Sequence, residues 1–495
     1  MKTPITASIL YDYITCPHRV SMDFFEDPLK RDEPNPFVQL LWEKGTLFEK
    51  EVIKNLKMTF LDLSGFKEEE KERLTLEAMK RGEPLIYSGR IHEDGLLGIP
   101  DLLRKENGGY IAGDIKSGAG EEGPEDLSTP KEHYGVQLAL YTDILERKGL
   151  SSGRHAFVWD IHGKEVIYEL TKTYGSRNPR TLWQDYQECL AEAASIIEQS
   201  NKTMPAYSGV CKLCHWYSTC IDRLTRDNDL TLIPELGRSR RDAMIEYVKS
   251  VSELAEISLE SFINGKKTIF PGIGPNSLIK FNERAKLQTS KNARPLLHTP
   301  IEFPDHKLEL FFDIEVDPMR DICYLHGFVE RRNFDNATEK FVAFFAEDVT
   351  PEFEKAAFAE AWSYMQEHRP CSIYYYSKYE RTIYRKLQEK YPDVCSAEEI
   401  EELFDPEHAI DLYYDVVKKA TEWPTKDYSI KTLAKYLGFN WRDTNPSGAA
   451  SIEWFDRWIK TGDPQVRQRI LDYNEDDCIA TRVLLDGIRQ LTPNI

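Results

Sequence analysis

The pattern of apolar and polar positions divides the chain into three stretches. Residues 1–225 begin with helical periodicity, pass through short strand-like runs between 86 and 117, and return to helical periodicity at about 131–148 and 180–200. The stretch 226–295 is charged and helical in pattern, with two glycine turns. From Leu308 a strand-rich run begins, and helices and strands then alternate. We therefore predict an α/β multidomain protein with domains 1–225, 226–300 and 301–495.

Length and composition agree with several globular domains. A chain of 495 residues exceeds one ordinary core, and 41% hydrophobic residues with 12% aromatics suffice for globular packing. The net charge of −19 argues against a simple nucleic-acid coat protein but allows a local basic channel. Because the sequence has neither an apolar run of membrane-spanning length nor an apolar signal region at its start, we expect a cytoplasmic protein without a membrane partner.

Two short predicted strands carry the first group of chemically active residues, Gly98-Ile-Pro-Asp101 and Asp114-Ile-Lys116. A hairpin of these strands brings Asp101 next to Asp114, and Lys116 shares the face of Asp114 because it is two residues further along. The carboxylates can bind Mg²⁺ or Mn²⁺ as hard oxygen ligands. The ammonium can orient or help deprotonate the attacking water and stabilise the negative charge of the transition state. The ordinary alternative is a solvated Asp–Lys pair on an edge strand.

Helices on either side of these strands add three polar residues. Gln137 and Tyr141 lie four residues apart on one face of an apolar helix, and Glu49 lies on an earlier helix. The order of all these residues resembles the PD-(D/E)XK superfamily in its RecB-like form. The resemblance implies a restriction-endonuclease-like fold in which the two aspartates and the lysine are the catalytic core and Gln137 and Tyr141 the trailing motif. It also implies Glu49 as a metal ligand, at a position where the family often has histidine.

Three cysteines are bunched within ten residues, and an early cysteine is the best candidate for a fourth ligand. The set is Cys16, Cys211, Cys214 and Cys220. This plan resembles that of CRISPR-adaptation nucleases and AddB-type helicase–nucleases, and the resemblance implies that the cysteines hold a [4Fe–4S] cluster. Four-thiolate Zn²⁺ is the rival, because spacing does not separate the two, and His18 and His215 are further nitrogen donors.

The C-terminal stretch carries a second acidic constellation. Asp313 and Glu315 end a strand two residues apart, and Tyr473 and Asp477 lie four residues apart on a predicted helix. This order resembles the DEDD exonucleases of the RNase H-like fold, in their tyrosine subtype. The resemblance implies a 3′–5′ exonuclease-type domain in which the acids hold two metal ions and Tyr473 orients the nucleophilic water.

The middle acid of this constellation departs from the family pattern. Glu380 stands where the family has aspartate, and its extra methylene shifts the carboxylate. Asp411 is a further acid that can bind metal directly or contact the residues that bind it. Lys431 can offset the negative charge of these acids. The alternative is that this site is inactive.

The middle stretch contains Phe270-Pro-Gly272-Ile-Gly274, which resembles the hairpin of helix-hairpin-helix modules. Glycines there let backbone N–H groups approach a DNA phosphate. Basic residues are expected to add phosphate contacts. They are Arg238, Arg240, Arg241, Lys280, Arg284 and Lys286.

These features together predict a metal-dependent DNA nuclease with two active sites, exonucleolytic on single-stranded or end-containing DNA, in repair, recombination or defence. The alternative is a DNA-binding or scaffold component of such a complex, with one or both sites inactive. The sequence has no phosphate-cradling Gly-x-x-x-x-Gly-Lys-Ser/Thr loop. A helicase activity would therefore come from a separate partner protein, or is not needed.

Overall fold

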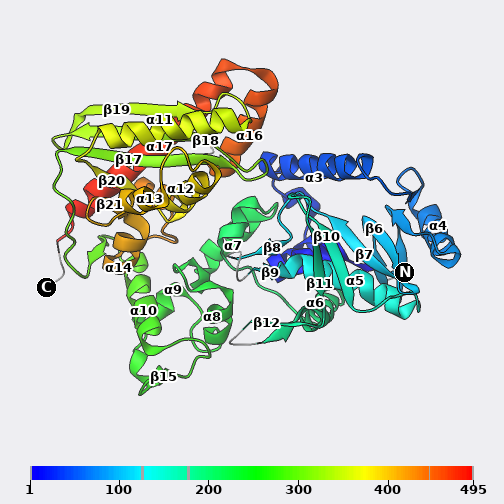
Figure 1. Ribbon diagram of the computed structural model, residues 1–495. Helices are drawn as coiled ribbons and strands as arrows, with labels where there is room; N and C mark the ends of the chain where they lie inside the picture. The colour runs from blue at the N-terminus through cyan, green and yellow to red at the C-terminus, as the bar shows by residue number, and fades with distance from the viewer. Residues whose placement is uncertain (1–2, 124–127, 176–178, 445, 493–495) are drawn as a thin grey trace. The chain divides into compact units, whose positions relative to one another are not determined.

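The computed structural model describes residues 3–123, 128–175, 179–444 and 446–492 (Figure 1). It separates into two compact units, Met1–Pro205 with Gly209–Cys220, and Ala206–Ser208 with Ile221–Ile495. In the described part of the chain, no helix combines the length and the apolar character that crossing a membrane requires.

The first unit is built on a six-stranded sheet in the order β11-β10-β7-β6-β3-β2. Strands β6 and β7 form an antiparallel hairpin with Leu102 opposite Gly113, and β7 pairs in parallel with β10. The predicted strand region between 86 and 117 therefore supplies β3, β6 and β7 of this sheet, whereas its strands between 91 and 98 belong to a second sheet. The strands are β2 (Leu61–Asp62), β3 (Leu85–Tyr87), β6 (Leu102–Glu106), β7 (Gly109–Ile115), β10 (His155–Trp159) and β11 (Glu165–Glu169).

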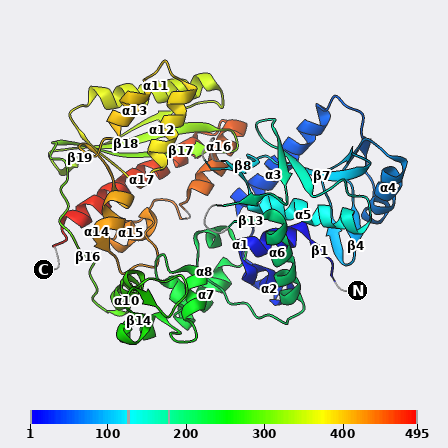
Figure 2. The ribbon, with the colours of Figure 1, turned by 60° about the horizontal axis from the view of Figure 1, so that its bottom comes forward.

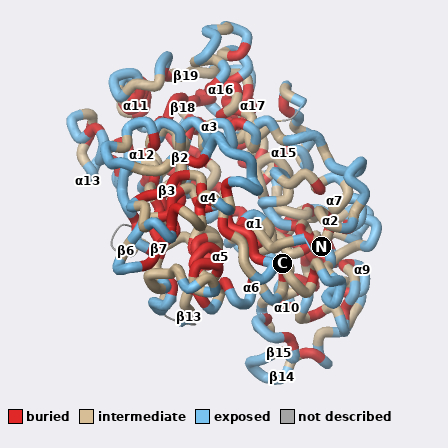
Figure 3. Tube along the Cα trace, turned by 90° about the vertical axis from the view of Figure 1, so that its right-hand side faces the viewer, coloured by how far each residue is buried: buried red, intermediate tan, exposed pale blue. Residues whose placement is uncertain are grey.

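Side-chain alternation along β7 decides which way its acid points. Tyr110 and Ala112 join a core with helices α1 (Ala7–Thr15), α5 (Glu132–Arg147) and α6 (Leu182–Ile197). Ile111 and Ile115 pack on the other face, in a cluster that includes Ile53 of α3 (Pro36–Lys54). Asp114 has the parity of Ala112 and so faces α5. Figure 3 shows α5 largely in the colour of buried residues.

A smaller, three-stranded sheet holds the segment of chain that leads to Asp101. It has the order β1-β5-β4, with β1 (Ile5–Thr6), β4 (Ile91–Glu93) and β5 (Leu96–Gly98). Gly98 ends β5 against α5, where an added Cβ would lie 2.7 Å from Tyr141 Cδ1 and 3.1 Å from Ile91 Cγ1. Only glycine lets the chain pass this close to Tyr141 before it reaches Asp101.

The second unit contains a five-stranded sheet in the order β19-β18-β17-β20-β21. The first three strands are antiparallel neighbours, and β20 and β21 add in parallel. They are β17 (Leu308–Asp317), β18 (Ile322–Arg332), β19 (Asp335–Phe345), β20 (Ser372–Tyr375) and β21 (Ala409–Asp411). The strand run predicted from Leu308 is β17.

Helices cover both faces of this sheet (Figure 2). Leu310 and Phe312 of β17 pack in one cluster with α11 (Pro351–Glu367), α12 (Tyr379–Lys390) and α13 (Ala397–Leu403). Phe311 packs in another cluster with α17 (Pro464–Arg489). Asp313 and Glu315 share the parity of Phe311, so they face α17. Further helices are α14 (Lys418–Ala420), α15 (Ile430–Tyr436), α16 (Gly448–Thr461) and the π-helix η6 (Leu412–Val417).

The stretch that precedes this sheet is helical with its own apolar cluster, which includes Leu254, Phe270 and Leu278. Its elements are α8 (Gly237–Met244), α9 (Val251–Glu256), α10 (Pro275–Thr289) and the hairpin of β14 (Ile263–Asn264) with β15 (Lys267–Thr268). Gly237 and Gly272 both have positive φ, at 67° and 71°, which glycine adopts without strain. The likeness to a helix-hairpin-helix module stays a prediction.

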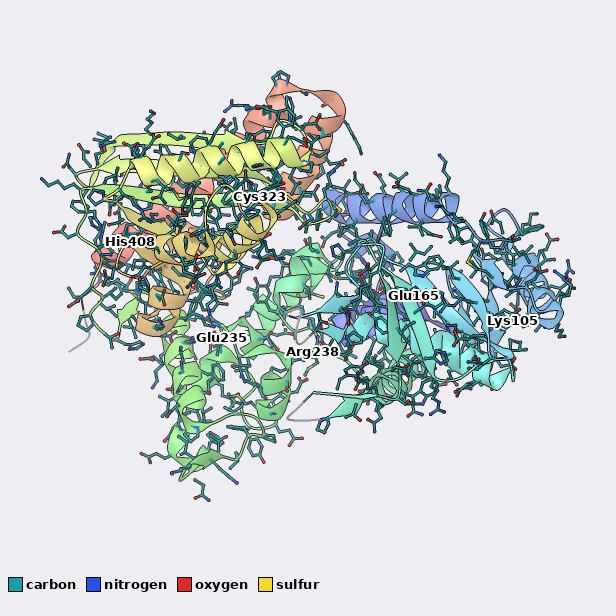
Figure 4. The ribbon with its side chains drawn as sticks, viewed as in Figure 1. Lys105, Glu165, Glu235, Arg238, Cys323 and His408 are labelled. Carbon is teal, nitrogen blue, oxygen red and sulfur yellow. The ribbon has the colours of Figure 1, made fainter. Side chains whose placement is uncertain are left out.

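Two arginines expected to contact phosphate are instead buried in ion pairs, and that expectation is wrong for them. Arg241 and Arg284 are each 1% exposed. Arg241 Nη1 lies 2.7 Å from Asp229 Oδ2, and Arg284 Nε lies 2.7 Å from Glu422 Oε2. Glu235, labelled in Figure 4, gives Arg284 a second carboxylate at 3.1 Å. A buried guanidinium needs such partners because leaving its charge unpaired is costly.

Candidate active sites and cysteine cluster

The hairpin of β6 and β7 holds the two N-terminal aspartates side by side. Asp101 lies just before β6, and its Oδ2 accepts the backbone N–H of Ile115 at 2.7 Å. Its own backbone N–H lies 3.5 Å from Oδ1 of Asp114, which is 2% exposed. The structure therefore brings Asp101 and Asp114 together as the sequence predicts.

Lys116 points back over the same site. Its Nζ lies 2.7 Å from Asp114 Oδ2 and 3.3 Å from Gln137 Oε1, and it stands 5.3 Å from the ring centre of Tyr134. Burial lowers the pKa of this ammonium, but the charges of Asp114 and Asp101 outweigh burial and the net pKa is raised. With no cation on the two aspartates, Lys116 is thus a charged donor held in place by Asp114 and Gln137.

Two more predicted residues reach this site from other elements. Tyr141 on α5 is 5% exposed, and burial together with the Asp114 and Asp101 charges raises its pKa well above the ordinary range. Glu49 on α3 accepts a hydrogen bond from the Tyr87 hydroxyl at 2.9 Å. Tyr87, which sequence reasoning missed, thereby orients the Glu49 carboxylate, whose place as the counterpart of the family's histidine stays a prediction.

The electrostatics of the N-terminal acids favour a bound cation. The pKa of Asp101 is raised well above its ordinary range, chiefly by burial and then by the Asp114 charge, and the Glu49 charge contributes in the same direction. Buried like charges are unfavourable unless a cation compensates them. The oxygen donors of Glu49, Asp101 and Asp114 fit Mg²⁺ or Mn²⁺, which prefer such ligands.

The C-terminal acids converge more closely. Among the described residues, the ligand oxygens of Asp313, Glu315 and Asp477 lie within 4.8 Å of one another. Asn474 Nδ2 donates to Asp313 Oδ2 at 2.7 Å, and Trp441 Nε1 donates to Asp477 Oδ1 at 2.7 Å. Neither donor was found by sequence reasoning, although Asn474 directly follows the tyrosine of the motif.

The tyrosine of this motif is held by a lysine. Tyr473 is 2% exposed, and its hydroxyl oxygen accepts a hydrogen bond from Lys431 Nζ at 2.8 Å. The same Nζ lies 3.4 Å from each carboxylate oxygen of Asp477. Burial, followed by the Asp477 charge, raises the pKa of Tyr473 well above its ordinary range. The phenol therefore keeps its proton as a donor.

Glu380, the predicted middle acid, is not part of this converging group of three, and its role as a metal ligand stays a prediction. It lies in the first turn of α12, is 3% exposed, and has an Oε2 atom buried without a hydrogen-bond partner in the described part of the chain. Burial, with the Asp411 and Asp477 charges, raises its pKa to about 8. An unpartnered buried carboxylate oxygen beside other acids fits a cation ligand.

Asp411 has a different arrangement from the other acids. Its Oδ1 accepts three backbone N–H groups, from Ser377 at 3.1 Å, Tyr413 at 2.9 Å and Tyr414 at 3.0 Å. Its Oδ2 is buried with no hydrogen-bond partner among the described residues. One oxygen thus anchors two backbone segments, and the other is left for a ligand.

The C-terminal acids as a set fit divalent metal. Burial is the largest cause that raises the pKa of Asp313 well above its ordinary range and that of Glu315 to about 8, and the Asp477 charge is the next. A cation among these oxygens would remove the repulsion. The all-oxygen donor set is that of Mg²⁺ and Mn²⁺.

Four partly exposed cysteines lie in the first unit. Cys16 separates α1 from α2 (Pro17–Phe25), Cys211 is in η3 (Gly209–Leu213), and Cys220 is in α7 (Tyr217–Asp227). The Cys214 backbone N–H donates to Cys211 O at 3.0 Å. Burial raises the pKa of the Cys214 thiol, and the charges of Cys16 and Cys211 add to this. The donor set fits thiolate-bound iron–sulfur or zinc alike.

A carboxylate organises the chain next to this cluster. Asp23 Oδ1 lies 2.7 Å from His215 Nε2, 2.9 Å from Trp216 Nε1 and 3.0 Å from Arg31 Nη2. His18 Nδ1 lies 2.8 Å from Thr203 Oγ1. Each histidine therefore has one ring nitrogen bonded to a protein partner, as metal-bound histidines commonly do, so both stay candidate zinc ligands.

Two family models match this chain. Residues 15–221 match the PD-(D/E)XK nuclease superfamily, and residues 310–488 match the RNase H superfamily. No curated protein matches the chain. The two matches confirm the predicted PD-(D/E)XK and RNase H-like domains and the mixed α/β fold. The RecB-like form, the tyrosine subtype and the cysteine-bound cluster stay predictions.

Proposed function

Since the chain carries a PD-(D/E)XK nuclease superfamily domain and an RNase H superfamily domain, and is thus a metal-dependent nuclease, we propose that it cuts DNA at two separate active sites. We propose further that it is exonucleolytic on single-stranded or end-containing DNA. The convergence of Asp313, Glu315 and Asp477 within 4.8 Å is the observation that carries this proposal most strongly.

In the N-terminal site, Asp101, Asp114 and Glu49 would hold Mg²⁺ or Mn²⁺. Such an ion, when bound, makes water a stronger nucleophile and neutralises phosphate charge. Lys116 is fixed by Asp114 and Gln137, so its ammonium is aimed before substrate arrives. Its ammonium is placed to orient or help deprotonate the attacking water and to stabilise negative charge on the phosphate.

In the C-terminal site, the metal ligands would be Asp313, Glu315, Glu380 and Asp477. Asp411 would bind the metal directly or contact the residues that bind it. Tyr473 accepts from Lys431 and therefore turns its own proton away from that lysine. A water held by the phenol O–H would be oriented for attack on the terminal phosphodiester. The buried phenol has few other conformations, which keeps that water in place.

The four cysteines are proposed to hold a [4Fe–4S] cluster, with zinc as the alternative. A cluster would join the α1–α2 junction to the segment that contains Cys211, Cys214 and Cys220, and so close a very long loop of chain. Its role in this proposal is structural. Iron and zinc analysis together with a visible absorption spectrum of the purified protein distinguishes the two metals.

The three-domain division stays part of the proposal, with residues 226–300 as a separate helical domain supported by their own apolar cluster. The cytoplasmic location, a helicase partner and a place in repair or defence are proposals as well. The competing function is a DNA-binding scaffold with inactive sites.

Cleavage assays test the function directly. End-labelled single-stranded and double-stranded DNA is incubated with Mg²⁺ or Mn²⁺ and with wild type, Lys116→Ala or Asp313→Ala. We expect wild type to cut and each variant to lose part of the activity. Full activity in both variants would overturn the site assignments, and no cutting by wild type would favour the scaffold.

A further inference from the structure

Five side chains form an aromatic and basic surface, here called the tyrosine platform, beside the C-terminal acids. The members are Tyr376, Lys378, Tyr379, Tyr413 and Tyr414. They come from the loops that follow β20 and β21, which are parallel neighbours in the sheet. Both loops leave the same edge of the sheet, so residues distant in sequence meet there.

Ring contacts join three tyrosines and the lysine of the platform. The ring centres of Tyr376 and Tyr413 are 5.4 Å apart, and those of Tyr413 and Tyr414 are 4.8 Å apart at 80°. Lys378 Nζ lies 4.5 Å from the ring centre of Tyr414 and so links the second loop back to the first. Cation and ring faces are thus arranged next to one another.

The two loops of the platform are held by hydrogen bonds to Asp411 and contain strained or unusual backbone. Asp411 accepts the N–H groups of Ser377, Tyr413 and Tyr414 through one oxygen, so it clamps the two loops together. Ser377 has φ 113°, in a region that disfavours residues other than glycine. Tyr413 and Tyr414 lie in a π-helix. Strained backbone and π-helical turns persist mainly where function requires them.

Two rings of the platform are open to solvent at the edge of the acids. Tyr379 is 47% and Tyr414 36% exposed. Tyr379 directly follows Lys378 and directly precedes the buried Glu380. The exposed ring therefore borders the acidic site and does not belong to the core.

We propose that the tyrosine platform stacks unpaired nucleobases and leads a single strand into the C-terminal site. This inference rests on the proposed nuclease function and assigns its substrate-binding surface. Every nucleobase offers a π-face to a tyrosine ring, whereas the bases of a duplex are occupied by one another. Lys378 supplies positive charge for the sugar–phosphate backbone, although the chain as a whole has net charge −19.

Binding without cleavage tests the platform. Fluorescence anisotropy of the full chain in EDTA compares labelled oligothymidine with an abasic oligonucleotide of equal length. Wild type is expected to bind the base-bearing strand at least about tenfold more tightly. The double variant Tyr379→Leu/Tyr414→Leu is expected to lose this preference, and Tyr379→Phe/Tyr414→Phe to keep it because phenylalanine retains the ring. Phe353→Leu, an exposed aromatic on α11, is the matched control and keeps the preference.

The results separate this inference from the proposed function. Equal binding of base-bearing and abasic strands by wild type, or an unchanged preference in the folded double Leu variant, would overturn the platform. A base preference that depends on both tyrosines, without cutting in Mg²⁺ or Mn²⁺, would support the platform and overturn the nuclease activity. An oligouridine arm shows whether the single strand is DNA or RNA.

Discussion

Lys431 donates from its Nζ to the hydroxyl oxygen of Tyr473 at 2.8 Å and stands 3.4 Å from both carboxylate oxygens of Asp477. One ammonium therefore holds the residue that would orient water and one of the acids that would bind metal. It is also 4.9 Å from the ring centre of Tyr473, so the phenol is fixed by a hydrogen bond and by a cation–ring contact.

Replacing this lysine is expected to slow the C-terminal site. Lys431→Met keeps the length of the side chain but removes the donor and the charge, and losses of about 10- to 100-fold are typical for residues that position metal-site groups. Release of terminal nucleotides is measured in a Lys116→Ala background, so that only this site contributes. Lys435→Met, an exposed lysine on the same helix, serves as control. Equal rates for the two variants would show that Lys431 does not position Tyr473.

Gly98→Ala is expected to destabilise the first unit. The new Cβ would lie 2.7 Å from Tyr141 Cδ1 in a packed core, and overpacking of this kind costs about 1–3 kcal/mol. Urea unfolding measures the loss. Gly65→Ala is the matched control because a Cβ there meets nothing within 4 Å. Equal stability of the two variants would contradict the close approach of β5 to α5.

A buried histidine makes the stability of the second unit depend on pH. Burial lowers the pKa of His326 from 6.5 to about 3, and its Nδ1 lies 3.1 Å from the Tyr384 hydroxyl oxygen. Below pH 6.5 the unfolded chain takes up a proton that the folded chain refuses. The free energy of unfolding therefore falls as pH drops from 6.5 toward 3 and is constant, for this group, below that.

The contribution of His326 is measured by urea unfolding at pH 7 and pH 5. Between these values wild type is expected to lose about 2 kcal/mol more stability than His326→Gln, which cannot take up the proton. Replacing the exposed His298 by glutamine serves as control and keeps the wild-type dependence on pH. Parallel curves for wild type and His326→Gln would show that the histidine is not buried in the neutral form.

If the four cysteines bind metal as proposed, Cys214→Ser is expected to abolish that binding and to lower the melting temperature of the first unit. Loss of one of four thiolate ligands opens the site, and in such sites metal binding contributes folding free energy. Metal per chain and circular dichroism are the measurements. Cys189→Ser, a buried cysteine outside the cluster, is expected to keep the metal. Full metal content in Cys214→Ser would remove Cys214 from the ligand set.

Local periodicity was sufficient to predict the geometry of the acids. Asp114 and Lys116 share a face because a strand has a period of two, and Tyr473 and Asp477 share one because they are four apart on a helix. Each of these two relationships depends only on residues close together in the sequence. The short hairpin of β6 and β7 then brings Asp101 next to Asp114.

Contacts between distant segments could not be read in this way. Trp441 donates to Asp477 from a segment 36 residues earlier, and no local pattern marks it. Arg284 stands in a charged helix and has the sequence features of a surface residue, yet its partner Glu422 is 138 residues away and both are 1% exposed. Sequence alone gives no means to distinguish this buried ion pair from solvated charges.

Cleavage of end-labelled DNA by the double variant Lys116→Ala/Asp313→Ala tests most directly the central claim that the chain has two independent nuclease sites. With Mn²⁺ present, each single variant is predicted to retain one pattern of products, and the double variant to produce neither. Both patterns disappearing in one single variant, or either pattern persisting in the double variant, would contradict two sites built on these residues.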